Sequence, residues 1–143
     1  MKEIFLYIRD IIKNVPSINW IDLDKGQLNN YQERPAIDFP AVLVKVEYPS
    51  TTKLSGKTQQ CNAIITVNIV FDFMDDTSSI TPDDTLAQSL EVFDIAEQVH
   101  QALQGSMDNK IIRTPLERIS TRDPNRGDKV KTLVYTYTTK TIE

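Results

Sequence analysis

Apolar positions near the start of the chain recur at steps of three and four residues, which is the spacing of one helix face. Charged residues fill most of the other positions, and Pro16 ends the pattern. The apolar positions are Ile4, Phe5, Ile8, Ile11, Ile12 and Val15. We therefore predict an amphipathic helix that ends before Pro16, and after it a short strand or extended arm over 18–23 that leads into a loop.

Two longer segments have the alternation of strands. In residues 41–48 the positions on one side are Val42, Val44, Val46 and Tyr48, and in residues 62–73 they are Ile65, Val67, Ile69, Phe71 and Phe73. The polar residues 49–60 between them exceed the about two to five residues of a common hairpin loop. We predict an antiparallel hairpin whose long, mobile 49–60 loop is a candidate contact surface.

A second helix has clear end signals. Thr81 is the expected N-cap, Pro82 suits the first helical position, and Gly105 suits a left-handed C-terminal cap. Between them one apolar stripe contains Leu86, Leu90, Phe93, Ala96, Val99 and Leu103. We predict that this helix covers a sheet.

The last two segments, 111–123 and 129–142, are predicted strands joined by a turn at 124–127, and the final strand is rich in Thr and Tyr. The 143 residues suffice for one domain with one core. The predicted fold class is α+β: a single domain over 1–143 with a mostly antiparallel sheet of four or more strands and two helices packed on one face.

The net charge of −4 is unevenly distributed. Residues 1–108 contain 8 basic and 16 acidic residues, residues 109–143 contain 8 basic and 4 acidic ones, and none of the positions between Lys57 and Lys110 is Lys or Arg. This acidic middle would repel duplex DNA, since phosphate binding needs clustered cations. The two regions either neutralise each other within one fold or provide complementary contact surfaces.

Residues with catalytic or metal-binding potential are few. Cys61 is the only cysteine, which excludes an internal disulfide, and we expect a half-buried thiol at the start of a strand. His100 is the only histidine and needs no catalytic role. The carboxylates Asp72, Asp75 and Asp76 could hold a hard cation, although a solvated turn explains them more simply. We expect no enzyme, no cofactor, no metal and no membrane segment, and a cytosolic site of synthesis.

The order of elements, together with the segments "INWIDLDKGQL", "FPAVLVKVEYP" and "LERISTRDPNRGD", resembles the tail-terminator and tail-completion proteins of long-tailed bacteriophages. The resemblance covers essentially the whole chain and includes the entry at Phe39 and Pro40 into an apolar strand. It implies a structural protein of the virion tail, assembled in the cytoplasm of the bacterial host. Such a protein forms a homohexameric ring that caps the tail tube, ends its polymerisation and offers a joining surface to the head-side connector protein. Genome DNA passes through the ring without specific binding.

This resemblance also suggests two contact surfaces. In the 49–60 loop, Leu54 would anchor a neighbouring virion subunit and Lys53 and Lys57 would steer it. Near the end of the chain, a second set of basic residues would face the acidic segment of the next subunit in the ring: Arg118, Arg122, Arg126 and Lys129. Two alternatives stay open, a head-to-tail connector subunit of similar fold and a cellular protein-binding module that acts through the 49–60 loop.

Overall fold

The computed structural model describes residues 1–29, 31, 34–72, 76–128 and 130–143. The helices are α1 (Lys2–Ile12), α2 (Asp83–Ser89) and α3 (Glu91–Leu103). The strands are β1 (Trp20–Leu23), β2 (Ala41–Ser55), β3 (Thr58–Phe71), β4 (Glu117–Arg122) and β5 (Lys131–Ile142). None of the helices within these residues is long and apolar enough to cross a membrane.

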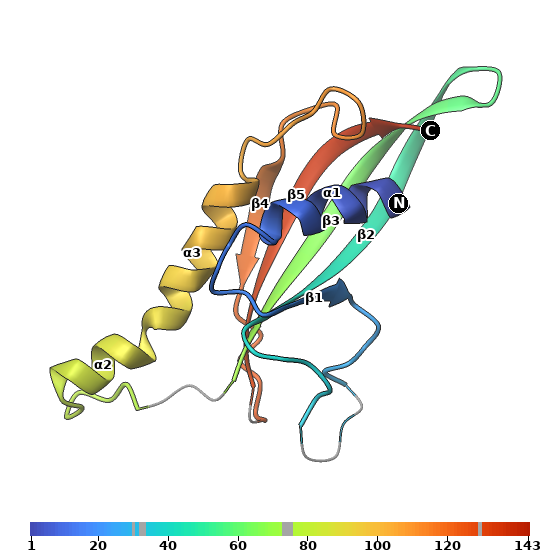
Figure 1. Ribbon diagram of the computed structural model, residues 1–143. Helices are drawn as coiled ribbons and strands as arrows, with labels where there is room; N and C mark the ends of the chain where they lie inside the picture. Colours follow the sequence, from blue (N-terminus) through green and yellow to red (C-terminus); the bar gives the residue numbers. More distant parts are fainter. Residues whose placement is uncertain (30, 32–33, 73–75, 129) are drawn as a thin grey trace.

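The five strands form one sheet in the order β1-β2-β3-β5-β4 (Figure 1). The short β1 pairs with β2 in parallel, and the other three pairings are antiparallel. The long hairpin of β2 and β3, with β5 beside it, makes the centre of the sheet. The predicted α+β class with a mostly antiparallel sheet is confirmed.

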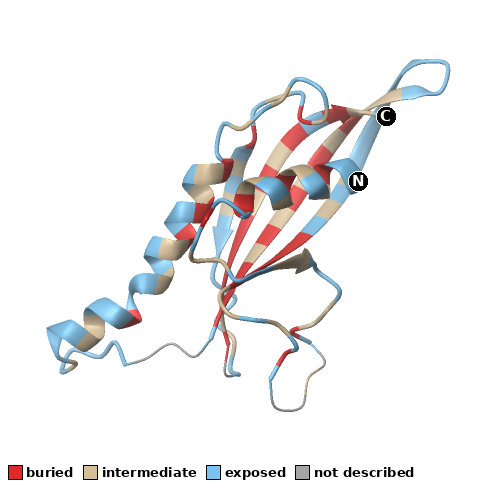
Figure 2. Cartoon of the chain, viewed as in Figure 1, coloured by how far each residue is buried: buried red, intermediate tan, exposed pale blue. Residues whose placement is uncertain are grey.

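The main core lies on one face of the sheet, beneath α1 and α3 (Figure 2). Helix α1 buries Ile4, Ile8 and Ile12, and α3 buries Ala96, Val99 and Leu103. Both sets contact the strand residues of the same face, which include Val44, Ile65, Val67, Ile69, Tyr135 and Tyr137. The prediction that two helices pack on one face is confirmed, because each presents a single apolar stripe to the sheet.

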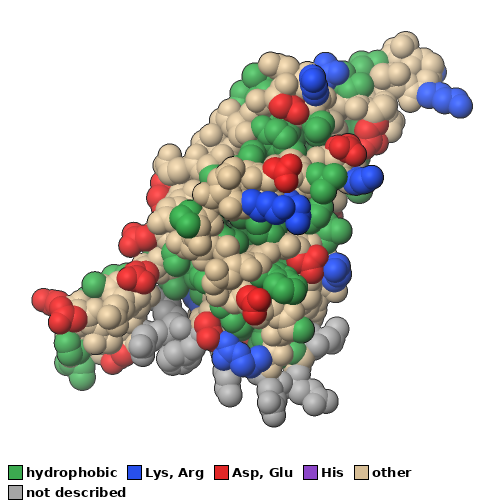
Figure 3. All heavy atoms as spheres, in the orientation of Figure 1, with side chains coloured by type: hydrophobic (Ala, Val, Ile, Leu, Met, Phe, Trp, Pro, Cys, Tyr) green, Lys and Arg blue, Asp and Glu red, His purple; other side chains and the backbone are tan. Residues whose placement is uncertain are grey.

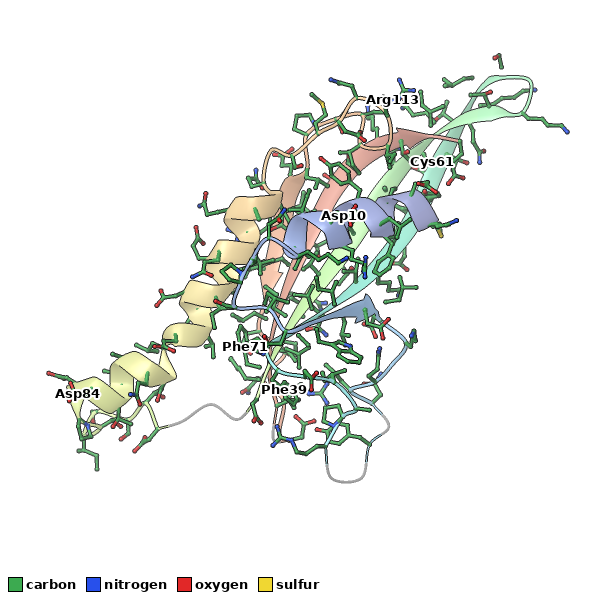
Figure 4. The ribbon with its side chains drawn as sticks, in the orientation of Figure 1. Asp10, Phe39, Cys61, Phe71, Asp84 and Arg113 are labelled. Carbon is green, nitrogen blue, oxygen red and sulfur yellow. The ribbon has the colours of Figure 1, made fainter. Side chains whose placement is uncertain are left out.

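A smaller core covers part of the opposite face. It consists of Leu28, Ala41, Leu43, Val70 and Val130, with Ile37 and Phe39 packed against it. Figure 4 labels Phe39 and Phe71 near one end of the sheet and Cys61 near the other. Cys61 is fully buried in β3, which is paired at this position with β2 on one side and β5 on the other. The expected half-buried thiol is therefore wrong.

The predicted second helix is divided into α2 and α3 at Leu90. The Ser89 hydroxyl donates a hydrogen bond to the Thr85 carbonyl oxygen at 2.9 Å, and this bond to the preceding turn often bends a helix. Pro82 rather than Thr81 occupies the N-cap position, and no side chain caps α2. Gly105 has a φ of +78°, as the predicted left-handed cap requires.

The predicted strand over 111–123 is shorter than expected and spans only Glu117–Arg122. The Asp108 carboxylate accepts hydrogen bonds from the backbone N–H groups of Lys110, Ile111 and Ile112, which folds that segment into a turn. Pro115, which lacks a backbone N–H, follows the turn. Strand pairing therefore begins only after Pro115.

Candidate functional site

Residues 49–60 form most of a projecting hairpin rather than a loop. Strand β2 continues to Ser55, β3 restarts at Thr58, and a two-residue turn of Gly56 and Lys57 joins them. The cross-strand pairs run from Ser50 and Asn62 outward to Ser55 and Thr58. The prediction of a long loop is therefore wrong, and we name residues 49–60 the hairpin arm (Figure 1).

Local sequence explains where the arm leaves the body and where it turns. The register shifts between Glu47 and Ser50, so β2 has an extra residue at Tyr48 and Pro49. A proline is tolerated at such a bulge because it cannot donate to the ladder. At the tip Gly56 has a φ of +55°, which a two-residue hairpin turn requires at its first position.

Polar contacts fix the base of the arm. The Tyr48 hydroxyl donates to Glu143 Oε1 at 2.9 Å and accepts from the Met1 ammonium at 2.8 Å. Burial and the bond to Glu143 raise the pKa of Tyr48 well above its usual range. Gln59 and Glu143 exchange two backbone hydrogen bonds of 2.7 and 2.9 Å. The arm is therefore an extension of the sheet, held on both of its strands.

Three of the predicted contact residues lie together on the outer part of this arm. Lys53, Leu54 and Lys57 are all exposed, and Leu54 leaves half of its surface in water. Every residue from 49 to 58 is exposed, so neither face of the outer arm is covered (Figure 2). A two-stranded ribbon of this kind can present side chains on both faces to a partner.

The predicted basic contact residues have different environments. The guanidinium carbon Cζ of Arg118 lies 4.7 Å from the ring centre of Tyr135, a cation–π distance. Arg122 is exposed at the end of the edge strand β4 and has no ion pair with any described residue. Arg126 donates a hydrogen bond to the Leu28 carbonyl oxygen within the same chain, and Lys129 lies outside the described residues. Among Arg118, Arg122 and Arg126, only Arg122 has neither an ion pair nor a cation–π contact with a described residue.

Arg126 ties together two segments that are distant in sequence. Its guanidinium donates to both carboxylate oxygens of Asp128, at 3.0 and 2.6 Å, and to the Leu28 carbonyl oxygen at 2.7 Å. The Tyr31 hydroxyl also bonds Asp128. The bonded guanidinium holds the pKa of Asp128 well below its usual range. The Arg-Gly-Asp sequence at 126–128 is therefore part of an internal contact.

Replacing Asp128 by Asn should lower the free energy of unfolding by about 1 kcal/mol near pH 7, a modest value because the pair is partly exposed. The folded-state pKa is depressed, so the carboxylate stabilises the fold above the unfolded pKa of about 4 and loses this effect as the pH falls further. Urea unfolding at pH 7 and pH 3 should thus show a smaller difference at pH 3. The exposed Asp38→Asn is the control, and an equal loss from both variants at pH 7 would contradict the Arg126 contact.

His100 lies in an aromatic cluster on the core side of α3. Its Nδ1 is hydrogen-bonded to the Tyr137 hydroxyl at 2.9 Å, and its ring stacks on Tyr137 and meets Tyr135 edge-on. Burial, helped by the nearby Arg118 charge, lowers the pKa of His100. This is the environment of a packed neutral histidine.

Proton NMR should show a titration midpoint for His100 below the ordinary value of about 6.5. Since the unfolded chain binds this proton more tightly, stability should fall as the pH drops below about 6.5. Replacing His100 by Gln should weaken that dependence. A midpoint at or above the ordinary value would refute the packing described for its ring.

The carboxylates considered for a cation are not gathered into a site. Asp72 pairs with Arg34, Asp76 accepts the Ser78 backbone N–H at 3.0 Å, and Asp75 lies outside the described residues. Among the residues that the structure describes, no group of three or more His, Cys, Asp or Glu side chains could hold a metal ion.

Two surface features escaped prediction from the sequence. Leu90 and Phe93 belong to the predicted buried stripe but are 38% and 45% exposed, because the sheet does not extend beneath the start of α3 (Figure 1). A small groove lies between the end of α1 and β1, lined by Arg9, Lys13, Ile18, Asn19, Trp20 and Ile21. The charged residues in and just after α1 read as its solvent-facing side, so the sequence did not indicate that Arg9 and Lys13 line a groove.

Comparison with known proteins finds no matching family model and no similar curated protein. Among solved structures, the chain is similar to a chain described as "Virion of native gene transfer agent (GTA) particle". The TM-score is 0.47 and the sequence identity 10%, with 95% of this chain and 84% of the other covered.

Proposed function

We propose that this chain is a structural virion protein, a tail terminator that forms a homohexameric ring on the end of a phage tail tube. The ring would stop polymerisation of the tube and present the joining surface to the head-side connector protein. Genome DNA would pass through its channel without specific binding, and the protein would be assembled into the tail in the cytoplasm of the bacterial host. The proposal rests on the whole-chain resemblance in the order and sequence of the elements.

The observation that carries the proposal furthest is the hairpin arm. An assembly protein must reach a neighbouring subunit while its own core stays closed, and a sheet that continues past its helices provides such reach. The arm offers exposed Leu54 as an apolar anchor and Lys53 and Lys57 as charges that steer an acidic partner. The tail-tube protein or the head-side connector protein is the proposed partner.

Contacts around the ring would join different surfaces of neighbouring subunits, since a cyclic arrangement needs heterologous contacts. Arg122 is the best placed of the predicted basic residues, and Arg118 and Lys129 stay part of the proposed contact. Arg126 is a poor choice for a test, because its removal would break the internal contact with Asp128 and Leu28. Charge reversal at Arg122 alone is the cleaner substitution.

The test is the size and shape of the assembled protein. Light scattering, with and without the tail-tube protein, should detect a species near six times the 16.3 kDa chain mass, and electron microscopy should show rings with a central channel. Arg122→Glu should shift that species toward monomer without changing thermal unfolding. A chain that stays monomeric under all these conditions, yet binds one cellular protein through its arm, would favour the protein-binding module instead.

A further inference from the structure

The segment from Ile80 to Asp94, which we name the α2 projection, extends beyond the sheet and exposes apolar surface (Figure 1). Ile80 is 88% exposed, and Leu90 and Phe93 leave 38% and 45% of their surfaces in water. Leu90 and Phe93 are three residues apart, so their side chains lie on the same side of the helical segment. Ser89 is the only residue of α2 that is buried, so α2 has little packing of its own within the described fold, whereas Val92 at the start of α3 packs against the main core.

Exposed carboxylates lie in the same segment as this apolar surface. They are Asp83, Asp84, Glu91 and Asp94, and no described residue forms an ion pair with any of them. Figure 3 shows acidic and hydrophobic side chains next to one another at this end of the molecule. A partner for the projection must therefore be apolar and basic together.

The groove between α1 and β1 has that chemistry. Its cations are Arg9 and Lys13, which have no ion pair among the described residues, and its apolar wall includes Ile18 and the 37%-exposed Trp20. Its volume of about 230 Å³ lies below the roughly 300–1,000 Å³ of small-molecule pockets and suits one or two inserted side chains. The groove thus fits a protein segment better than a free ligand.

The projection and the groove lie on different parts of one subunit. Figure 4 labels Asp84 at the far end of α2 and Asp10 on α1, with α3 between the two helices in the view. Surfaces that complement each other but lie apart on one chain produce a heterologous contact, which repeats from copy to copy and closes into a ring when the rotation allows.

We infer that the α2 projection of one copy of this chain docks into the α1–β1 groove of the next copy. Leu90, Phe93 or Ile80 fills the groove beside Trp20, and the carboxylates of the projection pair with Arg9 and Lys13. The inference rests on the proposed ring and names two surfaces that build it. It assigns the acidic segment a basic partner near the start of the chain, in addition to Arg122.

Charge exchange between the two surfaces tests the docking. The groove variant is Arg9→Glu with Lys13→Glu, and the projection variant is Glu91→Lys with Asp94→Lys. Sedimentation velocity of each full-length variant alone should show self-association at least about tenfold weaker than wild type, the scale expected for losing close charge pairs. An equimolar mixture of the two should associate again, because each variant supplies the surface that complements the other.

The matched control is Lys2→Glu with Lys110→Glu, which changes the net charge as the groove variant does but at exposed sites outside both surfaces. It should associate like wild type, and circular dichroism should show that all variants are folded. Wild-type association by either surface variant, or a mixture that stays monomeric, would overturn the docking but leave the ring proposal standing. A wild-type protein that is monomeric in the same experiment would also overturn the docking. The role of the arm in tail completion is decided separately, by infectivity.

Discussion

Replacing Ile65 by Ala is expected to lower the free energy of unfolding by about 3 to 4 kcal/mol, the range for a fully buried large aliphatic side chain. Ile65 lies on the central strand β3, opposite Val46 of β2 and Tyr137 of β5. Its side chain belongs to the main core beneath α1 and α3. The smaller residue would leave a cavity. Because β3 is paired with a strand on each edge and covered by helices, the surrounding atoms cannot move in to close that cavity. Urea unfolding at pH 7 measures the loss.

The neighbouring residue provides the control. Ile64 points to the opposite face, is only half-buried and pairs with Glu47 and Thr138. Ile64→Ala should cost about 1 kcal/mol or less, because less apolar surface returns to water. Adjacent residues of a strand face opposite sides, so the pair tests the register directly. Equal losses would contradict a main core on the Ile65 face alone. A larger loss at Ile64 would mean that the main core lies on the other face.

The sequence predicted the elements that bury one face. The alternation in 41–48 and 62–71 and the stripe of α1 arise from burial, and burial decides which residues selection keeps apolar. Phe73, the last predicted position of the second strand, lies outside the described residues. The outer arm buries neither face, so residues 49–58 have no alternation and look like a loop. The remaining signals were local: the Thr residues, which favour strands, and Gly56 in a two-residue turn.

The contacts that connect distant segments could not be predicted. A periodic stripe indicates a helix but not where its partner surface ends, so Leu90 and Phe93 were assigned to the core although the sheet does not reach them. Likewise the sequence shows Arg126 as a free basic residue. Only the fold brings it to the carbonyl of Leu28, which is 98 positions away. Charge patterns alone do not distinguish an internal ion pair from a contact surface.

Under the proposed tail-terminator function, shortening the hairpin arm is expected to abolish tail completion while leaving the domain folded. In the short-arm variant Asn-Gly replaces residues 54–58, so that the paired Lys53 and Gln59 flank a two-residue turn. All five removed residues are exposed, so the free energy of unfolding should change by about 1 kcal/mol or less. Leu54 and Lys57, the proposed anchor and steering charge, are lost together. Complementation of a phage that lacks this gene should then fail by orders of magnitude in infectious titre.

Two further variants separate the anchor from the arm as a scaffold. Leu54→Asp keeps the full arm but removes its exposed apolar side chain, and we expect a loss of titre close to that of the short arm. Thr51→Ala with Thr58→Ala changes exposed arm residues of other chemistry and should complement like wild type. Wild-type titre from the short-arm variant would show that the arm makes no essential contact. Titre lost only in the short-arm variant, with Leu54→Asp still active, would assign the contact to the backbone edges of the arm, where an extended partner segment can pair as an added strand.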